Sequence, residues 1–125
     1  MIQRPNLLVL GASGGVANAF LHHLAEYRSF FGKLILLDKN KKVLQDKYIN
    51  HRLLRYTFIQ STIELPAQEK EYLSLLRKYN ITLVLDLTDM ASLEVLEATN
   101  RAKVSYINTA LNDEHKTVSE LVFNI

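Results

Sequence analysis

The sequence predicts an α/β protein with a doubly wound, Rossmann-like parallel sheet in a single three-layer domain. Five short apolar runs alternate with longer amphipathic runs along the 125 residues. Runs such as LLVL, LILL and LVLDL are apolar at successive positions, which is typical of strands buried on both faces of a sheet. Strand–helix alternation requires right-handed crossovers, and the expected strand order is 3-2-1-4-5.

The strands are expected at five places: Leu7–Leu10, Leu34–Leu37, Thr57–Gln60, Leu83–Leu87 and Ser105–Asn108. Helical spacing between them predicts which residues form the buried stripes. For the first helix these are Val16, Phe20, Leu21, Leu24 and Tyr27. A helix beginning near Pro66 has the stripe Leu73, Leu76 and Tyr79, and another, starting near Thr88–Ser92, contains Leu93, Leu96 and Glu97. A weaker helical pattern covers Lys41–Ile49, and a further one covers Asp113–Leu121.

A glycine-rich turn follows the first strand directly and leads into the first helix. Its pattern is G-x-x-G-x-x-A, with Gly11 allowing a tight turn, Gly14 allowing a phosphate to approach the backbone, and Ala17 allowing close packing on the sheet. Free N–H groups at Gly14, Gly15 and Val16, with the positive end of the helix, favour an anion there, and Ser13 adds a hydroxyl. This order of parts is typical of a dinucleotide-binding unit. The alternative is a purely structural turn.

An aspartate ends the second strand, 21 residues after Ala17. A carboxylate at about this spacing accepts hydrogen bonds from the ribose of the adenosine half and repels a 2′-phosphate. Asp38 therefore favours NAD, while Lys39, Lys41 and Lys42 keep NADP possible. Alternatively, Asp38 caps a turn or the following helix.

The other strand ends should lie at the same edge of the sheet. Thr88 and Asp89 follow the fourth strand and are expected to line the ligand crevice, although Asp89 is as well placed for a helix N-cap. Asp86, inside that strand, needs hydrogen-bond partners if it is buried. Asn108 reaches the same rim, and Ser61 or Thr62 is placed to read an adenine edge.

Composition excludes several function classes. The chain has no cysteine, so thiol catalysis and thiolate metal sites are absent. The net charge of +2 gives no support for a nucleic-acid or membrane partner, and the short apolar start predicts a cytoplasmic protein. The sequence contains no P-loop and no G-x-S-x-G motif. We expect no catalytic residue and no metal site, because the histidines show neither a metal-ligand spacing nor a visible base–orienter pair.

Most of the chain, from about Asn6 to Leu111, resembles saccharopine dehydrogenase-like NAD(P)-binding domains. The start LLVLGASGGVA resembles the family's cofactor loop. The motif L-x-V-L-E-A at Leu93–Ala98 and the strand motif Y-[IV]-[DN]-T at Tyr106–Thr109 resemble its fourth-to-fifth-strand unit. The chain departs from the family at Ser13 in the glycine turn, at the run after the third strand, and at Asn108, where an acid is frequent.

The resemblance implies that residues 1–125 form the NAD(P)-binding domain of an oxidoreductase, with the substrate held by a second, catalytic domain that this chain lacks. The isolated domain should then be inactive, and it could form a homodimer. The alternative is a non-catalytic NAD(H)-sensing or binding module. A methyltransferase shares the glycine loop and the acid but usually needs further strands. A phosphoacceptor receiver domain is discarded, because Gly11, Gln60 and Asn108 stand near its required acid and lysine positions.

Overall fold

The computed structural model describes residues 3–88 and 93–108. Five parallel strands form one sheet in the order β3-β2-β1-β4-β5, which confirms the predicted fold class. The strands are β1 (Leu7–Leu10), β2 (Leu34–Asp38), β3 (Thr57–Gln60), β4 (Leu83–Asp86) and β5 (Ser105–Asn108). The helices are α1 (Gly15–Leu24), the 3₁₀ helix η1 (Ala25–Phe30), α2 (Lys42–Gln45), α3 (His51–Leu54), α4 (Glu69–Lys78) and α5 (Leu93–Arg101).

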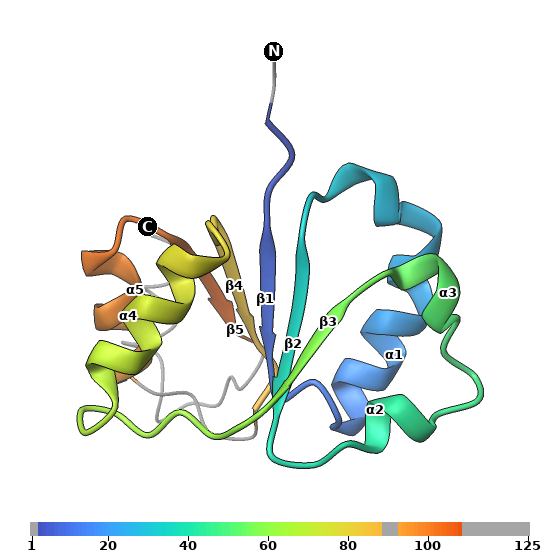
Figure 1. The fold of residues 1–125 in the computed structure, drawn as a ribbon, viewed down its shortest axis with the longest axis horizontal. Helices are drawn as coiled ribbons and strands as arrows, with labels where there is room; N and C mark the ends of the chain where they lie inside the picture. The colour runs from blue at the N-terminus through green and yellow to red at the C-terminus, as the bar shows by residue number, and fades with distance from the viewer. Residues whose placement is uncertain (1–2, 89–92, 109–125) are drawn as a thin grey trace, which may run out of the picture.

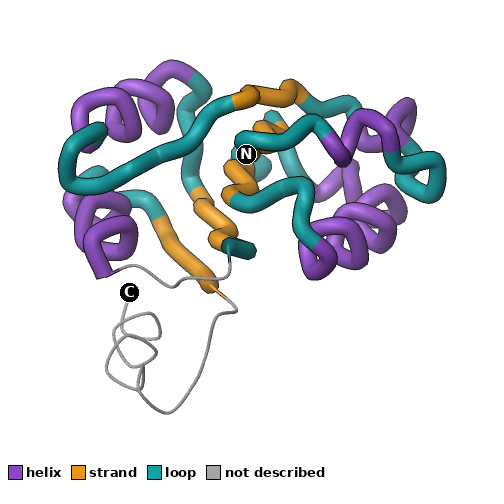
Figure 2. The backbone as a smooth tube through the Cα atoms, turned by 90° about the horizontal axis from the view of Figure 1, so that it is seen from below, coloured by secondary structure: helices purple, strands orange, loops and turns teal. Residues whose placement is uncertain are grey.

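The sheet separates two groups of helices. Figure 1 shows α1, α2 and α3 to the right of the strands and α4 and α5 to the left. Figure 2, seen from below, shows the strands in one row between these groups. This view looks onto the carboxyl ends of the strands, because β1 runs downward from the N-terminus in Figure 1.

Each face of the sheet carries its own core, because successive side chains of a strand point to opposite faces. One core contains side chains of α4 and α5 and the strand residues Leu8, Leu10, Ile35, Leu37, Val84 and Tyr106. The other contains side chains of α1 and the strand residues Leu7, Val9, Leu34 and Leu36. The central strands β1 and β2 are thus buried on both sides, as their apolar runs predicted.

The predicted stripe of the first helix is correct in its middle, at Phe20, Leu21 and Leu24, and wrong at its two ends. Ala17, Leu21 and Leu24 are buried, whereas Val16 and Tyr27 are 57% and 53% exposed. The reason lies partly in η1, where the chain tightens to about three residues per turn and brings Arg28 inward in place of Tyr27. Val16 lies in the first turn of α1, at the N-terminal end of the helix.

Arg28 is a buried cation that holds backbone rather than a carboxylate. Its guanidinium donates to the carbonyl oxygens of Leu54, Phe31 and Arg55, the last two at 3.0 Å each. Burial lowers the pKa of this guanidinium, and the charge of Arg55 acts in the same direction. Arg28 thereby ties the end of α3 to the end of η1.

Other predicted elements differ in extent. The pattern over Lys41–Ile49 gives only the single turn of α2, and α3, which the sequence did not suggest, follows it. The predicted fourth strand ends one residue early, at Asp86. The predicted helix over Asp113–Leu121 and the apolar end VFNI lie outside the described residues.

Candidate functional site

The turn after β1 takes its shape from Gly11. Its φ is +74°, in the left-handed region, and the N–H groups of Gly11 and Ala12 both donate to the carbonyl oxygen of Leu37, at 3.0 and 3.2 Å. A Cβ on Gly11 would lie 3.0 Å from the backbone nitrogen of Thr88. Glycine is therefore required here for two reasons, its backbone angle and the close approach of the β4 turn.

The start of α1 presents unpaired donors. The N–H of Gly14 donates to Gly11 at 3.2 Å, and the first bond of the helix ladder runs from Asn18 to Gly14 at 2.9 Å. Within residues 3–88 and 93–108, the N–H groups of Gly15 and Val16 have no hydrogen-bond partner, and both residues are exposed. Two exposed N–H groups at the positive end of a helix are suited to an anion.

Asp38 connects the end of β2 to the glycine turn. Its Oδ2 accepts the Ser13 N–H at 2.9 Å, and its Oδ1 accepts the Asn40 N–H at 2.9 Å. The Ser13 hydroxyl donates to the carbonyl oxygen of Asn40 at 2.8 Å and accepts the Val43 N–H at 3.4 Å. The turn-capping alternative for Asp38 is therefore realised in the structure. Two of the roughly four acceptor positions of a carboxylate remain for a ligand.

The β4 turn rests on a buried carboxylate. Asp86 is 2% exposed, and its Oδ1 accepts both the N–H and the hydroxyl of Thr88, at 3.0 and 2.5 Å. Its Oδ2 accepts the Tyr106 hydroxyl at 2.6 Å. Burial, and then the Asp86 carboxylate, raise the pKa of Tyr106. Asp86 thus has the hydrogen-bond partners that its burial requires, and Tyr106 is the partner that the sequence analysis missed.

A second buried tyrosine, Tyr72 of α4, is hydrogen-bonded to α5. The Tyr72 hydroxyl and the Thr99 hydroxyl are 2.6 Å apart, and Thr99 donates to the carbonyl oxygen of Val95 at 2.6 Å. Burial raises the pKa of Tyr72 to about 12. Both tyrosines are thus neutral hydrogen-bonding groups at physiological pH.

Asn108, at the end of β5, is a buried polar side chain close to Tyr106. It is 6% exposed and stands opposite Asp86 in the parallel register of β4 and β5. Burial and Asp86 raise the pKa of Tyr106, and the Asn108 side chain acts in the opposite direction.

The structure brings most of the predicted site residues together. Gly11 contacts Thr88, while Ser13 and Asp38 are hydrogen-bonded beside the exposed start of α1 at Gly14, Gly15 and Val16. Asp89 lies outside the described residues. Sequence reasoning missed Asn40 and Tyr106. Period-2 alternation could have indicated Tyr106, because it and Asp86 point to the same face of adjacent strands.

The end of β3 lies beside the end of β2. The Ser61 N–H donates to the Asp38 carbonyl oxygen at 3.0 Å, and the Gln60 side chain donates to that of Lys39 at 3.1 Å. The Ser61 hydroxyl donates to Thr62 at 3.2 Å. The predicted adenine-reading residues are therefore next to the predicted ribose acid.

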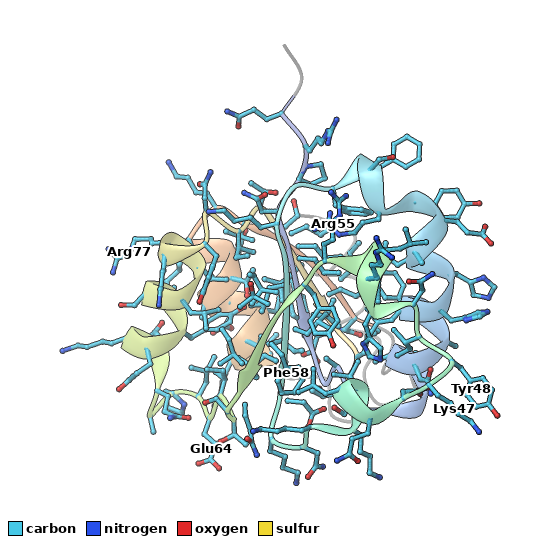
Figure 3. All side chains as sticks on the ribbon, turned by 45° about the vertical axis from the view of Figure 1, so that its right-hand side comes forward. Lys47, Tyr48, Arg55, Phe58, Glu64 and Arg77 are labelled. Carbon is cyan, nitrogen blue, oxygen red and sulfur yellow. The ribbon has the colours of Figure 1, made fainter. Side chains whose placement is uncertain are left out.

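The remaining surface features lie largely outside the carboxyl edge of the sheet where the predicted site residues meet. In Figure 3 the labelled Tyr48 and Arg55 lie well apart. The Tyr48 ring lies 5.3 Å from the Lys47 ammonium on the outer side of the molecule. A shallow groove of about 480 Å³ follows the outside of α1, lined by Gly15, Asn18, Ala19, His22, His23 and Tyr48. Among the described residues, no three metal-ligating side chains gather, and no helix is long and apolar enough to cross a membrane.

The model of the saccharopine dehydrogenase NADP binding domain matches residues 7–124 of this chain. The chain belongs to that family. A solved structure with a similar fold is a UDP-glucose-4-epimerase from Stenotrophomonas maltophila with bound NAD and formylated UDP-arabinopyranose, at 17% identity and a TM-score of 0.61. The alignment covers 83% of this family member but only 36% of the epimerase chain. The curated proteins gave no match.

Proposed function

We propose that this domain binds a nicotinamide dinucleotide across the carboxyl ends of its strands, with the pyrophosphate at the start of α1. The observation that carries the proposal is the pair of exposed, unpartnered N–H groups at Gly15 and Val16, in a turn fixed by Gly11 and Asp38. Membership of the saccharopine dehydrogenase NADP binding domain family supports the same ligand class.

Asp38 makes NAD the preferred dinucleotide in this proposal. Its carboxylate retains acceptor positions for ribose hydroxyls and would repel a 2′-phosphate. The exposed Lys39, Lys41 and Lys42 nearby supply the competing attraction for NADP. The ratio of the affinities for NAD and NADP therefore shows whether the negative charge of Asp38 or the positive charge of the lysines has the larger effect.

The domain supplies cofactor binding in an oxidoreductase, and a second domain holds the substrate. The hydride chemistry belongs to the cofactor, so this chain needs to bind and orient it rather than to donate or accept protons. In this proposal the buried acid Asp86 has a structural role, because its carboxylate holds the β4 turn.

Calorimetric titration of the chain with NAD, NADP and S-adenosylmethionine tests the proposal. We expect NAD to bind, NADP to bind more weakly and S-adenosylmethionine not to bind. Binding of S-adenosylmethionine alone would indicate a methyltransferase-like site. Absence of binding by all three would reduce the glycine turn to an architectural feature.

A further inference from the structure

We propose that the outer face of α1 and η1 is a dimer interface, at which two copies of this chain pack antiparallel across a two-fold axis. This interface is separate from dinucleotide binding and does not depend on it. An exposed stripe at helical spacing runs along the face, at Val16, Ala19, His23, Tyr27 and Phe30. Its three large hydrophobic members, Val16, Tyr27 and Phe30, are 57%, 53% and 65% exposed.

This face carries far less charge than the helices on the other side of the sheet. Residues 15–30 include two charged side chains, Glu26 and Arg28, and that of Arg28 is buried. In contrast, the sequence EKEYLSLLRK of α4 has five charged residues, and LEVLEATNR of α5 has three. A helix that is apolar on its inner and on its outer side is normally covered on both, and exposed apolar patches are typical of protein interfaces.

The two ends of the face are complementary to each other in shape. At one end, the exposed rings of Tyr27 and Phe30 are stacked, with centroids 6.2 Å apart, because side chains three residues apart eclipse in a 3₁₀ helix. We call this pair the aromatic knob. At the other end lies the groove of about 480 Å³, whose lining includes the small residues Gly15 and Ala19. The groove can therefore receive an aromatic knob from a second copy.

A two-fold axis near the middle of the face places each aromatic knob in the groove of the other copy. The knob lies about ten residues beyond the centre of the groove, which corresponds to roughly 15 Å along the helix. In a two-fold interface every contact forms twice. Glu26 of one copy then lies opposite His22 of the other, so the exposed carboxylate of the face meets a side chain that can carry the opposite charge.

The exposed apolar area is sufficient for a reversible dimer. Tyr48, which also lines the groove and points outward in Figure 3, is 72% exposed. At about 150–250 Å² for an aromatic side chain, the exposed parts of Tyr27, Phe30 and Tyr48 amount to roughly 400 Å² in each copy and about 800 Å² in the pair. The smaller side chains of the stripe bring the total near the 1,000 Å² or so that a specific interface requires.

Sedimentation velocity of the full chain at about 10–200 µM tests the proposal, because an interface of this size is expected to have a micromolar dissociation constant. We expect a reversible dimer. Phe30→Glu adds a charge to the knob, and Ala19→Arg fills the groove. Each should raise the dissociation constant about a hundredfold or more, because each change acts twice in a two-fold interface. Both positions are exposed, so urea unfolding should show that both variants remain folded.

A mixture of the two variants tests the antiparallel arrangement. The Phe30→Glu chain keeps an intact groove and the Ala19→Arg chain an intact knob, so a mixed pair retains one original contact. Its other contact places the introduced carboxylate opposite the introduced guanidinium. We therefore expect the mixture to dimerise although neither variant does so alone. The control is Leu93→Glu, which changes a 40% exposed leucine on α5, across the sheet, and should leave the dissociation constant unchanged.

Three results would overturn the proposal. The original chain could remain monomeric over the whole concentration range, the dimer could persist in Phe30→Glu and Ala19→Arg, or Leu93→Glu could weaken it equally. A mixture of Phe30→Glu and Ala19→Arg that stays monomeric would overturn the packing of knob into groove. Dimerisation of the mixture, with both separate variants monomeric, would support it.

Discussion

The backbone N–H of Ser13 donates a 2.9 Å hydrogen bond to the Oδ2 of Asp38, 25 residues away. This bond joins the glycine turn after β1 to the end of β2. Because the same carboxylate also accepts the Asn40 N–H, one acid fixes two turns at the carboxyl edge of the sheet. Asp38 therefore shapes the proposed phosphate site in addition to facing the proposed ribose.

Replacing Asp38 should affect both stability and cofactor choice. In Asp38→Ala the Ser13 and Asn40 N–H groups lose their acceptor, and we expect the free energy of unfolding to fall by roughly 1–3 kcal/mol. NAD should lose more affinity than NADP, because the repulsion of the 2′-phosphate disappears with the carboxylate. Urea unfolding and calorimetry measure the two effects.

Asp46→Ala is the matched control for that experiment. Asp46 also accepts two hydrogen bonds, from the Tyr48 N–H at 2.8 Å and from the Asn18 side chain, but it follows α2 rather than ending a strand, and the proposal gives it no contact with the ribose. It should lower stability without changing the NAD-to-NADP ratio. If NAD and NADP lose affinity equally in Asp38→Ala, Asp38 is not the discriminating residue.

Gly14 allows ligand binding to be separated from folding. It is the N-cap of α1, an exposed position at which aspartate is favourable, so Gly14→Asp should keep or raise stability. The new carboxylate would meet the pyrophosphate, and we expect dinucleotide binding to be lost in calorimetry. Gly14→Ala is the control, because its Cβ would meet only the Gly11 carbonyl oxygen at an ordinary 3.5 Å. Unchanged affinity in Gly14→Asp would place the site elsewhere.

Gly11 should tolerate no side chain. Gly11→Ala combines a φ of +74° with a Cβ only 3.0 Å from the Thr88 nitrogen and 3.1 Å from the Leu87 carbonyl carbon. Since backbone atoms on both sides must move, we expect a loss of at least about 1–3 kcal/mol in the free energy of unfolding. Gly15→Ala, with open space around its Cβ position, should cost far less in the same urea titration. Similar losses in the two variants would contradict this account of the turn.

The buried tyrosines predict a loss of stability in alkali. Tyr72 has a pKa of about 12 in the folded protein, whereas an unfolded tyrosine titrates near 10. The folded state holds this proton more tightly, so its contribution is complete below pH 10 and disappears as the pH rises toward 12. Urea unfolding between pH 8 and 12 should show this decline, with a smaller decline in Tyr72→Phe. An identical dependence of stability on pH in the two proteins would show that the pKa of Tyr72 is not raised in the folded state.

The local pattern of residues was sufficient for the fold and for the glycine turn. The uninterrupted apolar runs of β1 and β2 and the G-x-x-G-x-x-A turn are local features, and they predicted the strand order and the place of Gly11 correctly. The buried stripe of the first helix was predicted wrongly at Val16 and Tyr27. At Tyr27 the reason is the 3₁₀ geometry of η1 and the inward turn of Arg28, which depend on carbonyl groups of α3 and of the segment leading into β2. Short helices such as α3 carry too few residues for a periodic signal.

By itself the sequence determined the sheet, its order and the glycine turn, since burial periodicity and the backbone freedom of glycine act over a few neighbouring residues. The hydrogen-bond partners of the polar groups were decided only by the tertiary structure. Whether Asp38 holds Ser13 and whether Tyr106 reaches Asp86 depend on groups from separate strands and turns. Hydrogen bonds form only at short distances and suitable angles, and those are fixed when the strands pair.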